Sequence, residues 1–102
     1  MTPHTRYSSA MKTLQYLFII ERAGKNCSGY FPDVPGCVTT AKNVEKTLQN
    51  AAEALELHLE EESRPPRPRT LAWHLDKGSL SIQPTDIVTW VPYQHQPALA
   101  AA

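Results

Sequence analysis

A segment at residues 14–22 with large apolar side chains at every position from 16 to 20 is the clearest pattern in the chain. In an extended strand these positions divide between two faces, with Tyr16, Phe18 and Ile20 on one and Leu17 and Ile19 on the other. We therefore predict a strand here, and both of its faces require cover. Residues 23–26 predict a turn, after which residues 27–31 predict a second strand, antiparallel to the first.

Two prolines and a glycine then interrupt the apolar pattern within five residues. Pro32 and Pro35 fix φ and lack an N–H, and each favours an extended residue before it. Gly36 can take the positive φ with which the chain re-enters a strand. We predict a stiff corner here, followed by a third strand over 37–41.

One continuous apolar stripe at spacings of three and four follows the third strand. Its members are Val44, Leu48, Ala51, Ala52, Leu55 and Leu59. Asn43 is a good N-cap, and Glu45 in the first turn suits the helix dipole. We predict a helix that runs to about Glu62, although three glutamates would then lie at its C-terminal end, where the dipole disfavours anions.

The remaining segments give shorter signals. Prolines at 65, 66 and 68 predict an extended connector over 63–69, and residues 70–77 fit one or two helical turns or a short strand. Residues 86–93 predict a last strand, in which Pro92 indicates an edge position or a strand end. We expect residues 1–13 to be a flexible leader, with Met1 and Met11 both possible starts, and residues 94–102 to be a disordered tail.

These elements sum to one α+β domain over residues 14–93. We predict a two-layer sandwich in which a three-stranded antiparallel meander plus a final strand packs on one long helix. A single helix covers one face of such a sheet, and we find no other segment to cover the second. We therefore expect the second face to meet another copy of the chain, in a dimer or tetramer, or a partner.

Charge and composition exclude several classes of protein. Ten basic and ten acidic residues give a formal net charge of +0, which argues against electrostatic binding of nucleic acid or membrane by the domain as a whole. No apolar run approaches the roughly 18 residues of a membrane helix, and no secretory signal precedes the first strand. Two cysteines do not make a disulfide framework. We expect a cytoplasmic protein.

These residues resemble the HicB antitoxin family. The resemblance covers about residues 14–93 and lies in the opening strand Tyr16-Leu17-Phe18-Ile19-Ile20-Glu21, the block Gly29-Tyr30-Phe31-Pro32-Asp33-Val34-Pro35-Gly36-Cys37-Val38-Thr39, the helix with Ala51-Ala52-Glu53-Ala54-Leu55-Glu56-Leu57, and the closing Val88-Thr89-Trp90-Val91-Pro92-Tyr93. It implies a partial RNase-H-like fold without the acidic catalytic set. It also implies a partner, a small HicA-type toxin that cleaves RNA and whose active site the antitoxin occludes.

The chain departs from the family pattern at two places. The step into the helix is Ala41-Lys42-Asn43, where the family often has a Gly-Asp-Thr-like sequence. Many members also carry a C-terminal DNA-binding domain, whereas nine residues follow Tyr93 here, too few for a helix-turn-helix. We therefore expect no direct DNA binding by this chain.

The candidate partner-binding residues belong to the corner and the helix. They are Tyr30, Phe31, Asp33, Val34, Pro35, Glu53, Glu56 and Glu60. Asp33 either contacts a basic site on a partner or bonds the backbone of its own turn. Glu56 and Glu60 form a solvated helix face, a pair for acid/base chemistry, or an acidic surface that docks a basic toxin.

Other residues carry weaker chemical signals. Cys27 and Cys37 fit buried apolar thiols better than a metal site with His58 or a nucleophile. Arg64, Arg67 and Arg69 near Trp73 indicate either a solvated linker or a grip on nucleic acid.

We therefore expect a HicB-like antitoxin that binds and occludes a small basic toxin, with no catalysis, metal or cofactor of its own. The alternative is an orphan oligomeric or regulatory module of the same fold without a toxin. A nuclease would require carboxylates that are distant in sequence, such as Asp33, Asp76 and Asp86, to converge on a metal.

Overall fold

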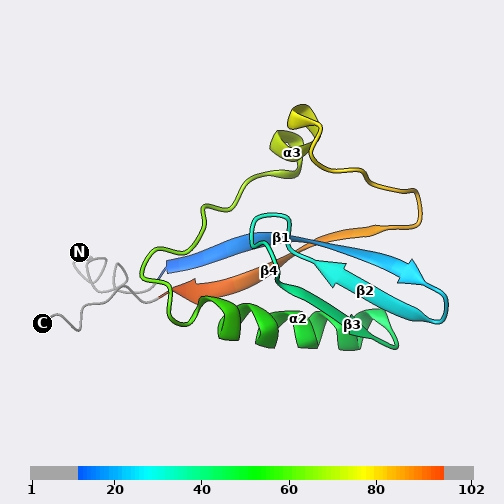
Figure 1. Ribbon diagram of the computed structural model, residues 1–102, viewed down its shortest axis with the longest axis horizontal. Coiled ribbons are helices and arrows are strands. Elements are labelled where there is room, and N and C mark those ends of the chain that lie inside the picture. The colour runs from blue at the N-terminus through cyan, green and yellow to red at the C-terminus, as the bar shows by residue number, and fades with distance from the viewer. Residues whose placement is uncertain (1–11, 96–102) are drawn as a thin grey trace, which may run out of the picture.

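The computed structural model describes residues 12–95 as a four-stranded antiparallel sheet with two helices (Figure 1). The strands are β1 (Lys12–Ala23), β2 (Asn26–Tyr30), β3 (Val38–Ala41) and β4 (Ile87–His95), and the helices are α2 (Val44–Leu59) and α3 (Leu71–Lys77). Their order in the sheet is β3-β2-β1-β4. The α+β class and the predicted meander with a final strand are thereby confirmed. Residues 1–11 of the predicted leader and 96–102 of the predicted tail lie outside the described part, whereas Lys12, Thr13, Gln94 and His95 belong to the two paired strands.

The first strand is central because it pairs on both sides. β4 runs antiparallel beside it from Lys12 to Ile20, and β2 pairs with its last part from Ile19 to Ala23. β4 therefore lies at the edge of the sheet, as Pro92 indicated, since a residue without an N–H is tolerated where no further strand needs a donor.

The main core lies between the sheet and α2. Tyr16, Phe18 and Ile20 point to this side, where they meet α2 and the residues of the corner. Gly29 is required here, because a Cβ at this position would collide with the Phe18 ring. The ring of Phe18 in turn packs against that of Phe31, with 4.6 Å between their centroids.

Two details of α2 differ from the prediction. Ala52 is exposed, and Thr47 is buried in its place, with its hydroxyl donating to the Asn43 carbonyl at 2.7 Å. The helix also ends at Leu59 instead of Glu62. An earlier end leaves the three glutamates outside the regular helix, which lessens their conflict with its dipole. Asn43 is the N-cap as predicted, since its side chain accepts the Lys46 N–H at 2.7 Å.

The second face of the sheet corrects the expectation that nothing in the chain could cover it. Leu17 and Ile19 point to this side, and both are 0% exposed in the isolated chain. Figure 1 shows why: α2 lies on one side of the strands, and the segment 63–86 with α3 passes over the other. The short helix was ambiguous in sequence because seven residues hold only two turns of pattern.

Candidate functional site

The proline–glycine corner consists of two consecutive tight turns. The Val34 N–H donates to the Phe31 carbonyl and the Cys37 N–H donates to the Val34 carbonyl, both at 3.1 Å. In the second turn Pro35 and Gly36 are the central residues, and Gly36 has φ of 87°, so this turn matches the type that takes proline and then a residue with positive φ. The Phe31 N–H closes the loop on the Cys37 carbonyl at 3.3 Å. The corner is therefore stiff, as the sequence predicted.

Asp33 ties this corner to the segment on the second face. Its Oδ2 accepts the backbone N–H of Arg69 and its Oδ1 lies 2.8 Å from Nε2 of His74, with the Arg69 bond also 2.8 Å long. The side chains of Asp33 and His74 are 6% and 7% exposed. We call this arrangement the Asp33 junction. Neither sequence interpretation of Asp33 anticipated it, because its partners lie 36 and 41 positions away.

The short helix places His74 for this contact. Thr70 caps α3 by accepting the Trp73 N–H at 3.0 Å, and the helix ends at Gly78, whose φ is 71°. Ser79 Oγ lies 3.4 Å from Nδ1 of His74 and 3.5 Å from the His74 carbonyl, to which it donates. A carboxylate, an imidazole and a hydroxyl thus stand in the order used by hydrolases. Here, however, the Asp33 carboxylate also accepts the Arg69 N–H, and the Ser79 hydroxyl also donates to the His74 carbonyl near the end of α3. These bonds join the corner, the connector and the end of α3.

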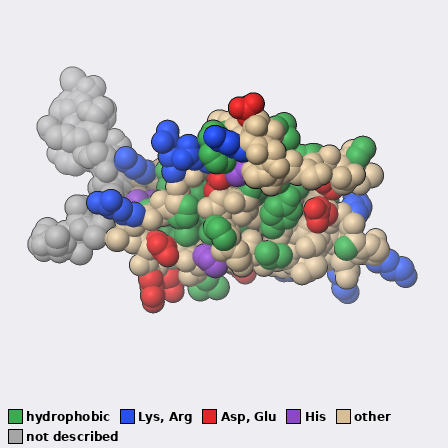
Figure 2. All heavy atoms as spheres, turned by 45° about the horizontal axis from the view of Figure 1, so that its top comes forward, with side chains coloured by type: hydrophobic (Ala, Val, Ile, Leu, Met, Phe, Trp, Pro, Cys, Tyr) green, Lys and Arg blue, Asp and Glu red, His purple; other side chains and the backbone are tan. Residues whose placement is uncertain are grey.

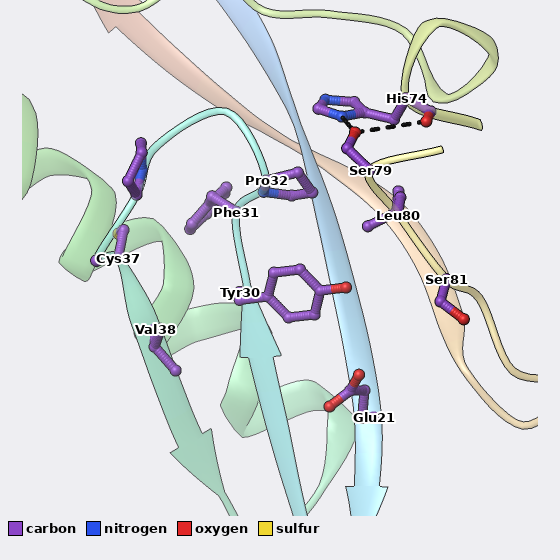
Figure 3. Close-up of a pocket in the computed structure, with 12 residues that line it drawn as sticks. Glu21, Tyr30, Phe31, Pro32, Cys37, Val38, His74, Ser79, Leu80 and Ser81 are labelled. Atoms are coloured by element: carbon purple, nitrogen blue, oxygen red, sulfur yellow. Dashed lines mark hydrogen bonds between the residues drawn. The ribbon is translucent and has the colours of Figure 1, made fainter. Parts of the chain in front are cut away.

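A cleft of about 610 Å³ opens between the corner and residues 79–81 (Figure 3). Its apolar lining includes Tyr30, Pro32, Pro35, Val38 and Leu80. Figure 3 shows the Tyr30 ring between the corner and this segment, with Glu21 near one end. Burial raises the pKa of the Tyr30 hydroxyl, and the carboxylates of Glu21 and Asp86 raise it further. The cleft is thus an apolar surface with an acidic end.

The predicted partner-binding residues fall into three groups. Phe31 and Val34 are buried in the core, at 3% and 2% exposed, although Phe31 also borders the cleft, and Asp33 is occupied by its junction. Tyr30 and Pro35 line the cleft. Glu53 and Glu56 are exposed on α2, and Glu60 is exposed directly after its end, on the other side of the sheet.

Two of those glutamates border a second hollow. Glu56 and Glu60 line a space of about 310 Å³ together with Tyr93, whose hydroxyl donates to the Leu59 carbonyl at 3.3 Å. Burial and the carboxylates of Glu56 and Glu60 raise the pKa of Tyr93. The structure therefore separates the predicted surface into two parts, one at the corner and one on α2.

Sequence reasoning missed several residues of the cleft. Glu21, Val38 and Leu80 line it, yet each lies in an unremarkable strand or loop context. Val38 is the one that the sequence pattern could have indicated. It is paired with Tyr30 in the strand register, so the two side chains share a face of the sheet, and Val38 is 58% exposed there.

The remaining candidate chemistry is limited in the described part of the chain. Cys27 and Cys37 are buried free thiols, as expected, and burial raises the pKa of Cys37. Between residues 12 and 95 no three metal-ligating side chains converge. Nor does either helix in that range have the length and apolar character needed to cross a membrane.

Comparisons with known proteins agree with this fold. A family model described as the HicB_like antitoxin of bacterial toxin-antitoxin system matches residues 16–84. Among solved structures, the chain is similar to antitoxin HicB3, with 25% identity and a TM-score of 0.62 over 84% of this chain and 65% of that one. It is also similar to a chain of the HicA3 and HicB3 toxin-antitoxin complex, with 26% identity and a TM-score of 0.57 over 76% of this chain and 95% of that one.

The chain thus spans 65% of the length of the solved HicB3 antitoxin. Comparison with curated proteins finds no match. The family model covers more than half of the chain, and its matched range includes β2, β3, α2, α3 and the corner. The chain therefore belongs to the HicB-like antitoxin family of bacterial toxin–antitoxin systems.

Proposed function

We propose that this chain neutralises a small RNA-cleaving toxin of the HicA class by binding it and covering its active site, without catalysing a reaction itself. Membership of the HicB-like family supports the antitoxin role. The similar HicA3 and HicB3 structure is a complex of a toxin with its antitoxin, which supports a partner of the same class. Action by binding also suits a chain that works in the cytoplasm, where such a toxin meets RNA.

The cleft beside the corner is the observation that carries this proposal. It is built on two tight turns and on the Asp33 junction, so little order has to be gained when a partner binds. A preorganised surface loses less conformational entropy on association, which leaves more of its contact energy as affinity. The Tyr30 ring and the exposed Val38 side chain offer the apolar contact that protein interfaces bury at their centre.

The carboxylates of α2 serve a second purpose in this proposal. Glu53, Glu56 and Glu60 lie on the opposite side of the sheet from the cleft, so we assign them to the attraction of a basic partner and to a peripheral contact. Complementary charge raises the rate of association more than it raises affinity.

The experiment titrates the purified chain into an RNA-cleavage assay of a HicA-class toxin, cloned from the reading frame adjacent to this gene. The wild-type chain should abolish cleavage at a ratio fixed by the complex. Val38→Asp places a charge in the cleft and should weaken inhibition at least tenfold, about 1.4 kcal/mol or more. Val38 is exposed, so this change leaves the core intact.

The matched control is Leu75→Asp. Leu75 is 50% exposed but does not line the cleft, so this variant should inhibit as the wild type does. Melting curves establish that both variants fold. Equal loss of inhibition in both variants would refute the assignment of the cleft, and a wild-type chain that leaves cleavage unchanged would refute the toxin partner.

A self-associating module without a toxin is the second candidate. The free edge of β4 and the exposed Trp90 favour it, because both suit contact with another copy of the chain. Pull-downs that recover only further copies of this chain, and no small basic protein, would select this alternative.

A further inference from the structure

The connector that follows α2 and the short helix α3 carry a basic surface. It consists of Arg64, Arg67, Arg69, Trp73 and Lys77, and we call it the connector–α3 surface. Asp76 is the only carboxylate in residues 63–78, whereas residues 43–62 hold six glutamates and one lysine. Figure 2 shows Lys and Arg side chains gathered beside α3 with a hydrophobic side chain between them. A net charge of +0 therefore conceals a strong local separation of charge.

Two cations of this surface, Arg69 and Lys77, lie over the ring of Trp73. The Arg69 guanidinium lies 4.6 Å from the centroid of the Trp73 ring, and Nζ of Lys77 lies 5.6 Å from it. The tryptophan remains 37% exposed. Such distances are those of cation–π contacts, which hold the charged groups close to the ring while their remaining donors face solvent.

The backbone beneath the surface is fixed. The N–H of Arg69 is held by Asp33, and the Trp73 ring packs edge-on against His74, with 5.0 Å between their centroids. Prolines at 65, 66 and 68 restrict the chain that carries Arg64 and Arg67. The connector–α3 surface is thus displayed on a stiff support by the same junction that builds the corner.

The charges of this surface are not neutralised within the described chain. Between residues 12 and 95 the one ion pair is that of Asp33 with His74, so no carboxylate lies within 4.0 Å of the four cations. An acidic partner can therefore reach all four.

We propose that the connector–α3 surface binds single-stranded nucleic acid, with Arg69 and Lys77 turning from the Trp73 ring to phosphates while an unpaired base takes their place on the ring. A cationic track beside an exposed aromatic ring is the combination that single-strand binders use, because every base offers a face for stacking. A duplex keeps its bases stacked on each other and cannot offer that face. An acidic peptide would match the charge but would leave the indole unused.

Trp73 provides the readout for the test. The chain has two tryptophans, so a Trp90→Phe variant keeps Trp73 as its only indole. A twelve-nucleotide uridine RNA, the matching thymidine DNA and a duplex of the same length are titrated into this full-length variant without any toxin. Both single strands should quench the fluorescence, and the duplex should not. The logarithm of the binding constant should fall with the logarithm of salt concentration, with a slope of about −0.7 for each phosphate contacted.

Paired charge variants locate the binding. Arg67→Ala with Arg69→Ala should lower affinity at least tenfold and reduce the salt slope by about 1.4, because two phosphate contacts are lost. The bond to Asp33 comes from the Arg69 backbone, so it survives this change. The control is Arg22→Ala with Lys25→Ala, which removes two exposed charges near the β1–β2 turn and should leave affinity unchanged.

Three results would overturn the proposal: no quenching by either strand, equal loss in both double variants, or equal quenching by the duplex or by polyglutamate. Quenching by one strand type only supports the site and shows that it distinguishes the two strands by the 2′-hydroxyl of the sugar or by the C5 methyl group of the base. None of these results depends on a toxin, so a failure here leaves the proposed antitoxin function standing.

Discussion

Tyr16 occupies the point where the central strand meets the connector. It is 0% exposed, and its hydroxyl donates to the Pro66 carbonyl at 2.6 Å. Burial raises its pKa from 10.0 to about 12, with smaller contributions from Tyr93 and Asp33. The folded state thus holds the tyrosine proton more tightly than the unfolded chain does.

From this raised pKa we predict that the free energy of unfolding falls in alkali. The contribution of Tyr16 is fully present below pH 10 and is lost as the pH rises from 10 to about 12, because the unfolded chain releases the proton first. The loss should approach about 2 to 3 kcal/mol. The free energy of unfolding of wild type and Tyr16→Phe, measured by urea denaturation from pH 8 to 11.5, checks this.

Tyr16→Phe isolates the effect, since every other titrating group is common to both proteins. The variant loses the bond to Pro66, so it should be less stable at neutral pH and the gap should close in alkali. A constant gap across the whole range would contradict the shifted pKa.

At the scale of elements, α3 is attached to the rest of the fold by few contacts. The helix has seven residues, and the Asp33 junction is what joins it to the corner. A buried carboxylate that accepts two hydrogen bonds leaves both donors unsatisfied when it is removed, and each such donor costs about 1 to 3 kcal/mol.

Asp33→Ala should therefore release the connector and α3. We expect a loss of about 2 to 4 kcal/mol in the free energy of unfolding, since two buried donors lose their acceptor. Hydrogen exchange should accelerate at residues 66–78 and stay unchanged in α2, because the main core does not include Asp33.

Asp86→Ala is the comparison for this variant. Asp86 accepts the Gln83 N–H at 2.8 Å within its own exposed loop. Its removal should cost less than 1 kcal/mol or so, as for a local turn bond with water nearby. Equal protection of residues 66–78 in wild type and Asp33→Ala would show that other contacts hold the segment.

Most elements could be predicted because their signals are local. The apolar segment around Phe18 and the cap at Asn43 each depend on residues within one strand or one turn. The cover of the second face could not be predicted, because it depends on where a connector without apolar periodicity passes in space. For the same reason the contact of Asp33 with His74 could not be predicted, because the two residues lie 41 positions apart and the sequence around each gives no sign of the other.

For the candidate site, the sequence indicated which block of residues forms the corner, but not which of its side chains are buried. Tyr30 and Pro35 do line the cleft, whereas Val34 from the same block turns into the core. Side chains alternate between two faces only in an extended strand. The corner consists of two consecutive turns, so that alternation does not predict which of its side chains point inward.

At the scale of the whole molecule, association of copies remains a prediction with a new basis. On the second face Leu17 and Ile19 are covered, whereas Trp90, the register partner of Leu17, stays exposed, so the original reason for an oligomer now applies only to that part of the face. The free edge of β4 and Trp90, which is 47% exposed, now provide the reason, because an unpaired strand beside an apolar side chain invites pairing.

We therefore expect a dimer or tetramer in light scattering at micromolar concentration. Trp90→Asp should shift the mass toward that of one chain, 11.4 kDa, because it places a charge beside the pairing edge. Lys25→Asp at the β1–β2 turn should leave the mass unchanged. A wild-type mass of one chain across the concentration range would exclude the oligomer.

The pairing of β1 with β4 has a consequence for biosynthesis. The central strand is made first, yet its longest partner is the last strand described, and the two align from Lys12↔His95 to Ile20↔Ile87. Contacts between such distant parts of a chain form slowly, because a long loop must close first. Until β4 has been synthesised, one edge of β1 has no partner strand among the described residues, so a chain that ends before β4 should be more sensitive to proteases than the full-length chain.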